Sequence, residues 1–202
     1  MSRSDRTPRQ RLAADDRRDA ILDAARELYA AHPYSEVSTK QVADAAGASA
    51  PLVFHYFGSK PGLYTAVVTD ALADLATTQR AADAALPEHT ASRERVRTSL
   101  TIYLDHIAGH PTTWAWPLRG GVEPAEAQEV RRRARATYVQ TLSDLLGFGA
   151  WARHHYALWG YFGFLDEACL AWVDRGCPDD DRDPLIEAAL GALQGALGDW
   201  GS

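Results

Sequence analysis

The sequence predicts an all-helical protein with a small N-terminal domain and a larger C-terminal domain. Three observations support this fold class. Apolar residues recur at helical spacing along the chain, no segment shows the alternation typical of a strand, and glycine, proline and serine signals separate the periodic segments. The chain has 202 residues, of which 46% are hydrophobic, so it can bury a sizeable core. The number of periodic segments predicts about nine helices.

The first helix is expected to begin at Asp15 or Asp16, either of which can cap it. It ends at His32, because Pro33 disfavours helical geometry in the residue before it. Residues 1–14 contain four arginines and no apolar period, so we expect a disordered basic arm there. A solvated tail without a function is the alternative.

Two short helices with a glycine between them follow. Ser38 and Gln41 form a capping-box pattern at the start of the first helix, and Gly47 can adopt the left-handed conformation that ends it. Ser49 can cap the second helix, and Pro51 is tolerated in its first turn. This arrangement is typical of a helix-turn-helix motif, whose second helix enters the major groove of DNA.

The only two lysines of the chain, Lys40 and Lys60, each lie within two residues of a predicted helix cap, Ser38 and Ser59. The helix that starts at Lys60 is expected to reach residue 82. Free amides and the positive end of the dipole make helix N-termini attractive to phosphate. Together with serine hydroxyls and ammonium groups, they predict contacts with a phosphate backbone. The alternative is that the serines are simple caps and the lysines are solvated.

The net charge of −6 does not exclude nucleic acid as a partner. Residues 1–64 contain nine Lys and Arg against eight Asp and Glu, whereas the rest of the chain contains twelve against nineteen. The acidic excess therefore lies outside the predicted DNA-binding part. Exposed charges are screened beyond about 10 Å at moderate salt, so a local cationic surface can still bind phosphate.

These residues resemble the DNA-binding domain of TetR-family transcriptional regulators. The resemblance covers residues 17–67 and is carried by Ala46-Gly47-Ala48-Ser49, Phe54-His55-Tyr56-Phe57 and Gly58-Ser59-Lys60. It implies a helix-turn-helix domain at residues 15–62 and a larger ligand-binding and dimerisation domain at residues 63–202. There are two departures: Phe54 stands where the family usually has tyrosine, and Pro33 where it usually has glycine.

The resemblance also implies which side chains contact DNA. Residues 38–40 would contact phosphates, residues 49–51 and His55 would face the major groove, and Tyr56 and Lys60 would hold the backbone, while Phe57 would pack in the core. Few of the groove-facing side chains can donate hydrogen bonds, so thymine methyl groups and DNA shape would supply much of the specificity. The predicted DNA-binding residues are Ser38, Thr39, Lys40, Ser49, Ala50, Pro51, Phe54, His55, Tyr56 and Lys60.

The rest of the chain shows long helical periods separated by turn signals. Helices are expected at residues 93–108, 123–146, 151–173 and 185–200, with a short aromatic element at residues 113–118 and an acidic loop at residues 179–183. The family resemblance implies an effector cavity among the middle helices, and aromatic walls there would suit a flat or hydrophobic effector. The predicted effector-binding residues are Tyr103, His106, Trp114, Trp116, Tyr138, Trp159 and Phe162. For each of them, ordinary core packing is the alternative.

The last two helices are expected to form a homodimer interface. Residues 156–165 are apolar around the whole helix, which predicts burial on all sides. Small residues on one side of the last helix would let a second helix approach closely; they are Ala188, Gly191, Ala192 and Gly195. A two-fold dimer would bind a roughly palindromic operator. The alternative is a core helix with alanine-rich filler.

Other candidate sites are weaker. His106 and His110 have the spacing of a metal pair, but Pro111 disrupts that turn. Arg135 and the three arginines at 131–133 are read as a solvated helix face with local ion pairs. The sequence predicts no catalytic residue, metal or cofactor. Cys169 is expected to be a buried free thiol.

The sequence thus predicts a cytoplasmic, homodimeric transcriptional regulator that is not an enzyme and does not enter the membrane. Its partners would be a double-stranded DNA operator and a small-molecule effector. A repressor released by a hydrophobic or aromatic effector is the expected mode of action. The alternative is a small helical enzyme or metal-binding protein in which the N-terminal motif is incidental.

Overall fold

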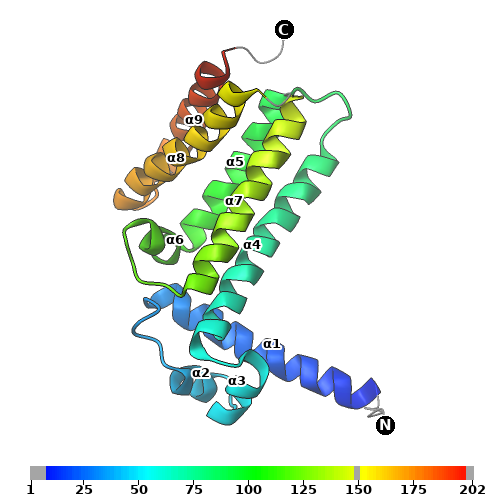
Figure 1. The fold of residues 1–202 in the computed structure, drawn as a ribbon, viewed down its shortest axis with the longest axis vertical. Helices are drawn as coiled ribbons and strands as arrows, with labels where there is room; N and C mark the ends of the chain where they lie inside the picture. The colour runs from blue at the N-terminus through cyan, green and yellow to red at the C-terminus, as the bar shows by residue number, and fades with distance from the viewer. Residues whose placement is uncertain (1–7, 148–150, 199–202) are drawn as a thin grey trace. The chain divides into compact units, whose positions relative to one another are not determined.

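The computed structural model describes residues 8–147 and 151–198, and side chains from residue 16 onwards. Within these ranges the chain is built from α-helices and one 3₁₀ turn, without a strand (Figure 1). The elements in chain order are α1 (Pro8–Ala31), α2 (Thr39–Ala45), α3 (Ala50–Phe57), α4 (Lys60–Ala85), α5 (Ser92–Gly109), α6 (Pro111–Leu118), α7 (Ala125–Leu146), α8 (Ala152–Asp174), η1 (Asp179–Asp181) and α9 (Arg182–Leu197). The predicted all-helical fold class is confirmed.

The chain divides into two compact units. The N-terminal unit comprises residues 1–70 and 121–130, and the C-terminal unit comprises residues 71–120 and 131–202. Helices α4 and α7 are each continuous across this division. The sequence-based boundary at residue 62 did not anticipate that residues 121–130 pack with the N-terminal unit, because a continuous helical pattern carries no signal of where its packing partner changes.

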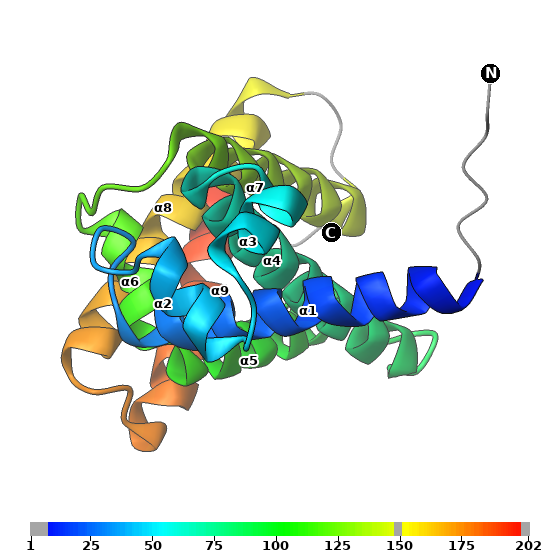
Figure 2. The ribbon, with the colours of Figure 1, turned by 90° about the horizontal axis from the view of Figure 1, so that it is seen from below.

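Helices α1, α2 and α3 pack around the core of the N-terminal unit (Figure 2). The core side chains are apolar residues at helical spacing, joined by one valine from the loop before α2 and one alanine from α7. They include Ile21, Leu22, Ala25, Tyr29, Val37, Val42, Ala43, Val53, Leu63, Tyr64, Val67, Val68 and Ala127. Burial of these side chains is the main force that holds the short helices α2 and α3, which would be marginal alone.

Helix α1 begins at Pro8, earlier than the predicted start at Asp15 or Asp16. Half of the predicted basic arm is therefore helical, and residues 1–7 lie outside the described residues. Proline suits this position because the first turn of a helix does not use its backbone N–H groups. The arginines at positions 9 and 11 do not interrupt a helix, since arginine is a good helix former.

The C-terminal unit has its core between α5, α7, α8 and α9. Helices α8 and α9 lie side by side, and α9 also packs against α5 (Figure 1). The largest fully buried side chains of the C-terminal unit come from these helices and include Leu104, Ile107, Leu158, Leu190 and Leu193. Cys169 is a free thiol in this core, as predicted.

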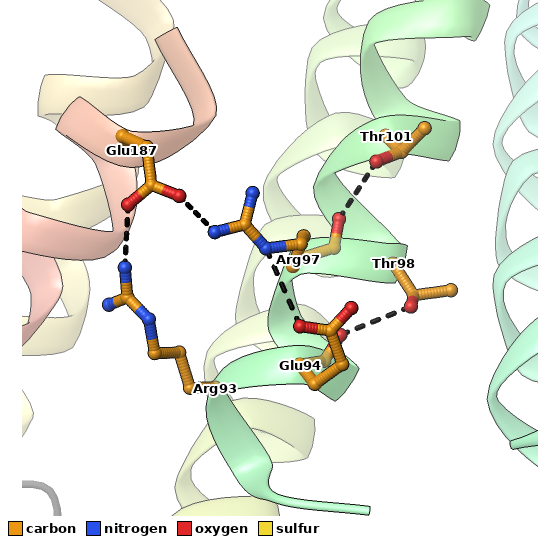
Figure 3. A network of polar contacts seen from close by, with 6 residues as sticks. All are labelled: Arg93, Glu94, Arg97, Thr98, Thr101 and Glu187. Atoms are coloured by element: carbon orange, nitrogen blue, oxygen red, sulfur yellow. Dashed lines mark hydrogen bonds and ion pairs between the residues drawn. The ribbon is translucent and has the colours of Figure 1, made fainter. Parts of the chain in front are cut away.

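An ion-pair network fixes α9 to α5 (Figure 3). The carboxylate of Glu187 on α9 lies between two arginines of α5, Arg93 at 2.6 Å and Arg97. Glu94 also contacts Arg97, at 3.5 Å. These side chains are partly to largely exposed to solvent, so each ion pair adds little stability.

The predicted acidic loop at residues 179–183 is only partly a loop. Residues 179–181 form the 3₁₀ turn η1, and α9 starts at Arg182, before the predicted residue 185. Pro184 is tolerated because it lies in the first turn, and Asp183 complements the positive end of the helix dipole. The helix ends at Leu197, before the predicted residue 200, because Gly198 adopts φ +91°. No described helix combines the length and the apolar character that crossing a membrane requires.

Candidate nucleic-acid interface

The turn between α2 and α3 has the geometry that the sequence predicted. Ser38 caps α2: its hydroxyl oxygen accepts a hydrogen bond from the backbone amide of Gln41 at 3.2 Å. The side-chain oxygen of Gln41 in turn accepts one from the backbone amide of Ser38 at 2.8 Å, which completes the capping box. Gly47 has φ +59°, and the Ala48 amide then reaches back to the Ala43 carbonyl at 2.8 Å. The chain therefore reverses within a few residues, and α3 leaves at an angle to α2.

One face of α3 is buried and the other is exposed. Val53 lies in the core, whereas Pro51, Phe54 and His55 are exposed on the opposite side. Phe54 is 46% exposed, although phenylalanine side chains are usually buried. The exposed side chains of α3 are therefore available to an external surface such as the major groove.

Ser49 precedes α3 in an extended conformation, but its side chain makes no capping hydrogen bond. The prediction that its hydroxyl caps α3 is wrong. Only the backbone carbonyl of Ser49 serves the helix, as the acceptor for Leu52 at 2.9 Å. Because the hydroxyl is exposed and not used as a cap, it can donate to a phosphate or a base edge.

The junction between α3 and α4 is tight. Gly58 has φ +75°, and Ser59 caps α4 by accepting the Gly62 amide at 3.0 Å. A Cβ atom at Gly62 would lie 2.2 Å from the carbonyl oxygen of Phe57. Gly62 is thus required for the close approach that places the start of α4 beside the end of α3, and sequence periodicity gave no sign of this.

The two lysines of the interface are in different environments. Lys40 is exposed and forms an i,i+4 ion pair with Asp44 at 2.6 Å. Such an exposed pair contributes little, so Lys40 can exchange Asp44 for a phosphate. Lys60 is half-buried: its ammonium lies 4.4 Å from the ring centre of Tyr34 and donates to the Ser35 carbonyl at 3.4 Å. Removal from water lowers the pKa of Lys60 below its usual value.

The remaining predicted residues lie on the same segments. Thr39 is the first residue of α2, Ala50 is the first residue of α3, and Tyr56 lies near the end of α3 with its ring 5.2 Å from that of His55. Phe57, expected in the core, is half-buried, and the Arg18 guanidinium lies over its ring at 5.2 Å. The structure therefore brings the predicted DNA-contact residues together at the starts of α2 and α4 and along α3.

Two comparisons identify the family. Residues 21–67 match the family model of bacterial regulatory proteins of the tetR family. The transcriptional activator FasR of Mycolicibacterium smegmatis is 34% identical over 192 residues, which cover 93% of this chain and 85% of FasR. The chain belongs to the TetR family. It is accordingly a DNA-binding transcriptional regulator with a helix-turn-helix domain, as its sequence predicted.

Two further comparisons extend the likeness over most of the TetR-family chain. The transcriptional regulator BetI of Agrobacterium fabrum is 30% identical over 89% of this chain and 74% of its own. The crystal structure of a tetR-family regulator from Streptomyces coelicolor has the same fold, with a TM-score of 0.73 and 24% identity over 91% of this chain and 80% of that one. Both helical units thus belong to the shared fold.

The predicted effector-binding residues all lie in the C-terminal unit of this TetR-family chain, where Tyr103, Trp114 and Phe162 pack against one hydrophobic core. The Trp114 indole donates to the Tyr103 hydroxyl at 3.0 Å, which links α6 to α5. The rings of Tyr138 and Phe162 are 6.5 Å apart and link α7 to α8. Trp159 instead lies on an exposed face of α8, with its ring 6.3 Å from His155.

His106 and Trp116 complete the predicted set. His106 is half-buried on α5, and burial, with His110 and Arg131 nearby, lowers its pKa. The rings of His106 and His110 are 5.9 Å apart, and the described residues offer no group of three or more metal-ligating side chains around them. The Trp116 indole N–H is buried and has no hydrogen-bond partner among the described residues.

Arg135 differs from its sequence-based interpretation. It was expected on a solvated helix face, but its guanidinium lies 2.5 Å from the Asp166 carboxylate of α8 and 5.7 Å from the Phe162 ring centre. Burial raises the pKa of Asp166, and Arg135 opposes that rise. The sequence gave no signal that separated Arg135 from the neighbouring arginines.

Proposed function

We propose that this TetR-family regulator binds DNA as a homodimer, with α3 of each protomer in a major groove. The exposed face of α3, set between two capped helix starts that each carry a lysine, is the observation that supports this mode. Helix α2 would brace the phosphate backbone while α3 contacts base edges. The helix starts would supply amides, serine hydroxyls and ammonium groups to phosphates.

The proposed roles follow from position and exposure. Phosphates are contacted from the start of α2, the end of α3 and the start of α4, by Ser38, Thr39, Lys40, Tyr56 and Lys60. Base edges are contacted from the exposed side of α3, by Ser49, Ala50, Pro51, Phe54 and His55. His55 is the one side chain of the second group with a ring nitrogen that can donate or accept, so it has the largest share in direct readout.

The test of DNA binding is salt-dependent, sequence-selective retention of the DNA upstream of the protein's own coding region. Affinity should fall steeply with salt, because phosphate contacts release counterions. A shuffled duplex of equal length and composition is the matched control. Equal binding to both duplexes would contradict a sequence-selective operator.

The proposed dimer is formed by the exposed faces of α8 and α9. In the single protomer, Tyr156 is 74% exposed, Phe164 40% and Trp159 36%, so α8 shows an uncovered apolar face where the sequence predicted burial on all sides. Gly191 and Gly195 on α9 have open space where a Cβ would be. Aromatic side chains beside small residues fit a close helix–helix contact with a second copy.

The effector is proposed to be a small hydrophobic or aromatic molecule with polar atoms that can form hydrogen bonds. Among the described residues, the buried polar atoms of the C-terminal unit without a hydrogen-bond partner include the Trp116 indole N–H and the Tyr138 and Tyr161 hydroxyls. Buried polar atoms in native proteins are usually paired, so these positions fit contacts with a ligand or with water. Tyr138 and Tyr161 both contact the ring of Phe162.

Effector binding would shift the dimer toward a form in which the two α3 helices no longer match successive major grooves. Tryptophan fluorescence during a metabolite screen tests this, with DNA release as the second readout. The expectation of a repressor is retained as part of the proposal, although the relative FasR is an activator by name. Lower expression of the neighbouring gene after deletion of the regulator would contradict repression.

A further inference from the structure

The ammonium of Lys60 is held by a loop that lies 25 residues earlier in the chain. Its nitrogen is 4.4 Å from the ring centre of Tyr34 and donates to the carbonyl oxygen of Ser35 at 3.4 Å. Tyr34 and Ser35 belong to the loop between α1 and α2, whereas Lys60 is the first residue of α4. All of these residues lie within the N-terminal unit.

Tyr34 is itself fixed by neighbouring aromatic rings. Its ring centre is 4.9 Å from that of Tyr64 and 6.3 Å from that of Tyr29, and Tyr29 meets Tyr64 edge-on at 5.0 Å. Tyr64 and Tyr29 are both buried. Tyr64 donates its hydroxyl to the carboxylate of Glu123 at 3.1 Å, and Glu123 is only 7% exposed.

These contacts restrict a side chain that is otherwise among the most mobile. A free lysine loses much rotamer entropy when it becomes ordered on a phosphate. The ring of Tyr34 and the carbonyl of Ser35 impose part of that order before DNA arrives. A lysine ammonium has three N–H donors, so one bond to Ser35 leaves donors for a phosphate oxygen.

We propose that Tyr34 is a positioning residue of the DNA interface, whose ring holds the Lys60 ammonium where it can contact a backbone phosphate. This inference rests on the proposed phosphate role of Lys60. Tyr34 would not touch DNA itself, and its effect would act through Lys60 alone.

The experiment measures DNA affinity as a function of salt for the full chain and four variants. The probe is a duplex that the wild-type protein selects from a random library. The variants are Tyr34→Phe, Tyr34→Leu, Lys60→Ala and the double variant Tyr34→Leu/Lys60→Ala. Lys60→Ala should lower the magnitude of the salt slope by about one for each protomer.

Tyr34→Leu should lower affinity about two- to fivefold for each protomer, because the freed Lys60 side chain must then lose rotamer freedom when it binds the phosphate. Tyr34→Phe keeps the ring face and should bind like the wild type. In the Lys60→Ala background, Tyr34→Leu should cause no further loss. If Tyr34 had only a structural role, Tyr34→Leu would lower affinity in the Lys60→Ala background as much as it does in the wild type. This double-mutant cycle therefore separates a positioning role from a structural one.

A further substitution at position 34 covers the case in which Tyr34→Leu does not fold. Pentafluorophenylalanine at position 34 keeps the shape of the ring but removes the negative face that attracts the ammonium. This substitution should lower DNA affinity as much as Tyr34→Leu does and should leave the melting temperature of the protein unchanged.

The failures can be told apart. If Lys60→Ala weakens binding while Tyr34→Leu and the fluorinated ring do not, the positioning role is overturned and the phosphate contact stands. The same holds if the loss from Tyr34→Leu persists in the Lys60→Ala background, or if Tyr34→Leu binds more tightly. If Lys60→Ala leaves the salt slope unchanged, the phosphate contact itself fails, and the positioning role fails with it.

Discussion

At the scale of single residues, small steric and polar details decide how the DNA-binding surface is presented. Ser38 and Ser59 each accept a backbone amide at a helix start, so their hydroxyls fix the positions of α2 and α4. Ser49 occupies the equivalent place before α3 without capping it. Similar serines thus have different roles, and only the three-dimensional structure distinguishes them.

Gly62 sets the contact between α3 and α4, so Gly62→Ala should be destabilising. Its Cβ would lie 2.2 Å from the Phe57 carbonyl, and backbone would have to move. We expect the free energy of unfolding to fall by about 1–3 kcal/mol, the usual cost of overpacking, with weaker DNA binding. Thermal unfolding followed by circular dichroism measures this. Gly109→Ala is the matched control, because open space surrounds that position. Equal melting temperatures for the two variants would contradict the steric argument.

His55 is expected to act in sequence readout. It is exposed on α3 and its ring nitrogens can contact a base edge. His55→Ala should weaken the free energy of binding to the preferred operator by about 1–3 kcal/mol. The loss should be much smaller on operators in which the contacted base pair has been replaced. Binding to a set of single-base-pair operator substitutions measures the change. Lys40→Ala is the control, since loss of a phosphate contact should weaken all duplexes similarly. An unchanged preference profile for His55→Ala would remove it from readout.

At the scale of secondary-structure elements, helix packing depends on contacts that the sequence pattern does not show. The segment before α7 is tied into the N-terminal unit by Glu123, a buried charged residue. Glu123 was expected as the first residue of a helix, but α7 begins at Ala125. Its carboxylate accepts from Tyr64, and its backbone carbonyl accepts from Gln128 at 3.1 Å. A helix-start signal and a buried anchor look the same in the sequence.

Tyr64→Phe should destabilise the N-terminal unit by about 1.5–3 kcal/mol, because a hydrogen bond to a buried charged group is lost. Chemical denaturation measures the change. Glu123→Leu removes the charge as well, so the double variant should cost less than the sum of the two single variants. Additive losses would show that the Tyr64–Glu123 contact contributes nothing of its own.

At the scale of the whole molecule, the apolar face of α8 is the feature that a single protomer leaves unexplained. Phe164→Glu on this face should convert the proposed dimer to a monomer, since it would bury a charge in an apolar contact. Leu118→Glu on α6 is the matched control, because Leu118 is also 40% exposed but lies outside the proposed interface. Light scattering coupled to size exclusion at micromolar concentration measures the mass. A wild-type monomer, or a Phe164→Glu dimer, would contradict the interface.

The sequence by itself determined the fold class, the order of the helices and the helix-turn-helix motif. These depend on local physics: helical periodicity, serine caps and a left-handed glycine are all encoded within a few neighbouring residues. The tertiary structure alone decided which side chains meet across the chain. The Lys60–Tyr34 and Tyr64–Glu123 contacts, the approach at Gly62 and the pairing of Arg135 with Asp166 join separate segments, and no local pattern records which distant residue fills the space beside them.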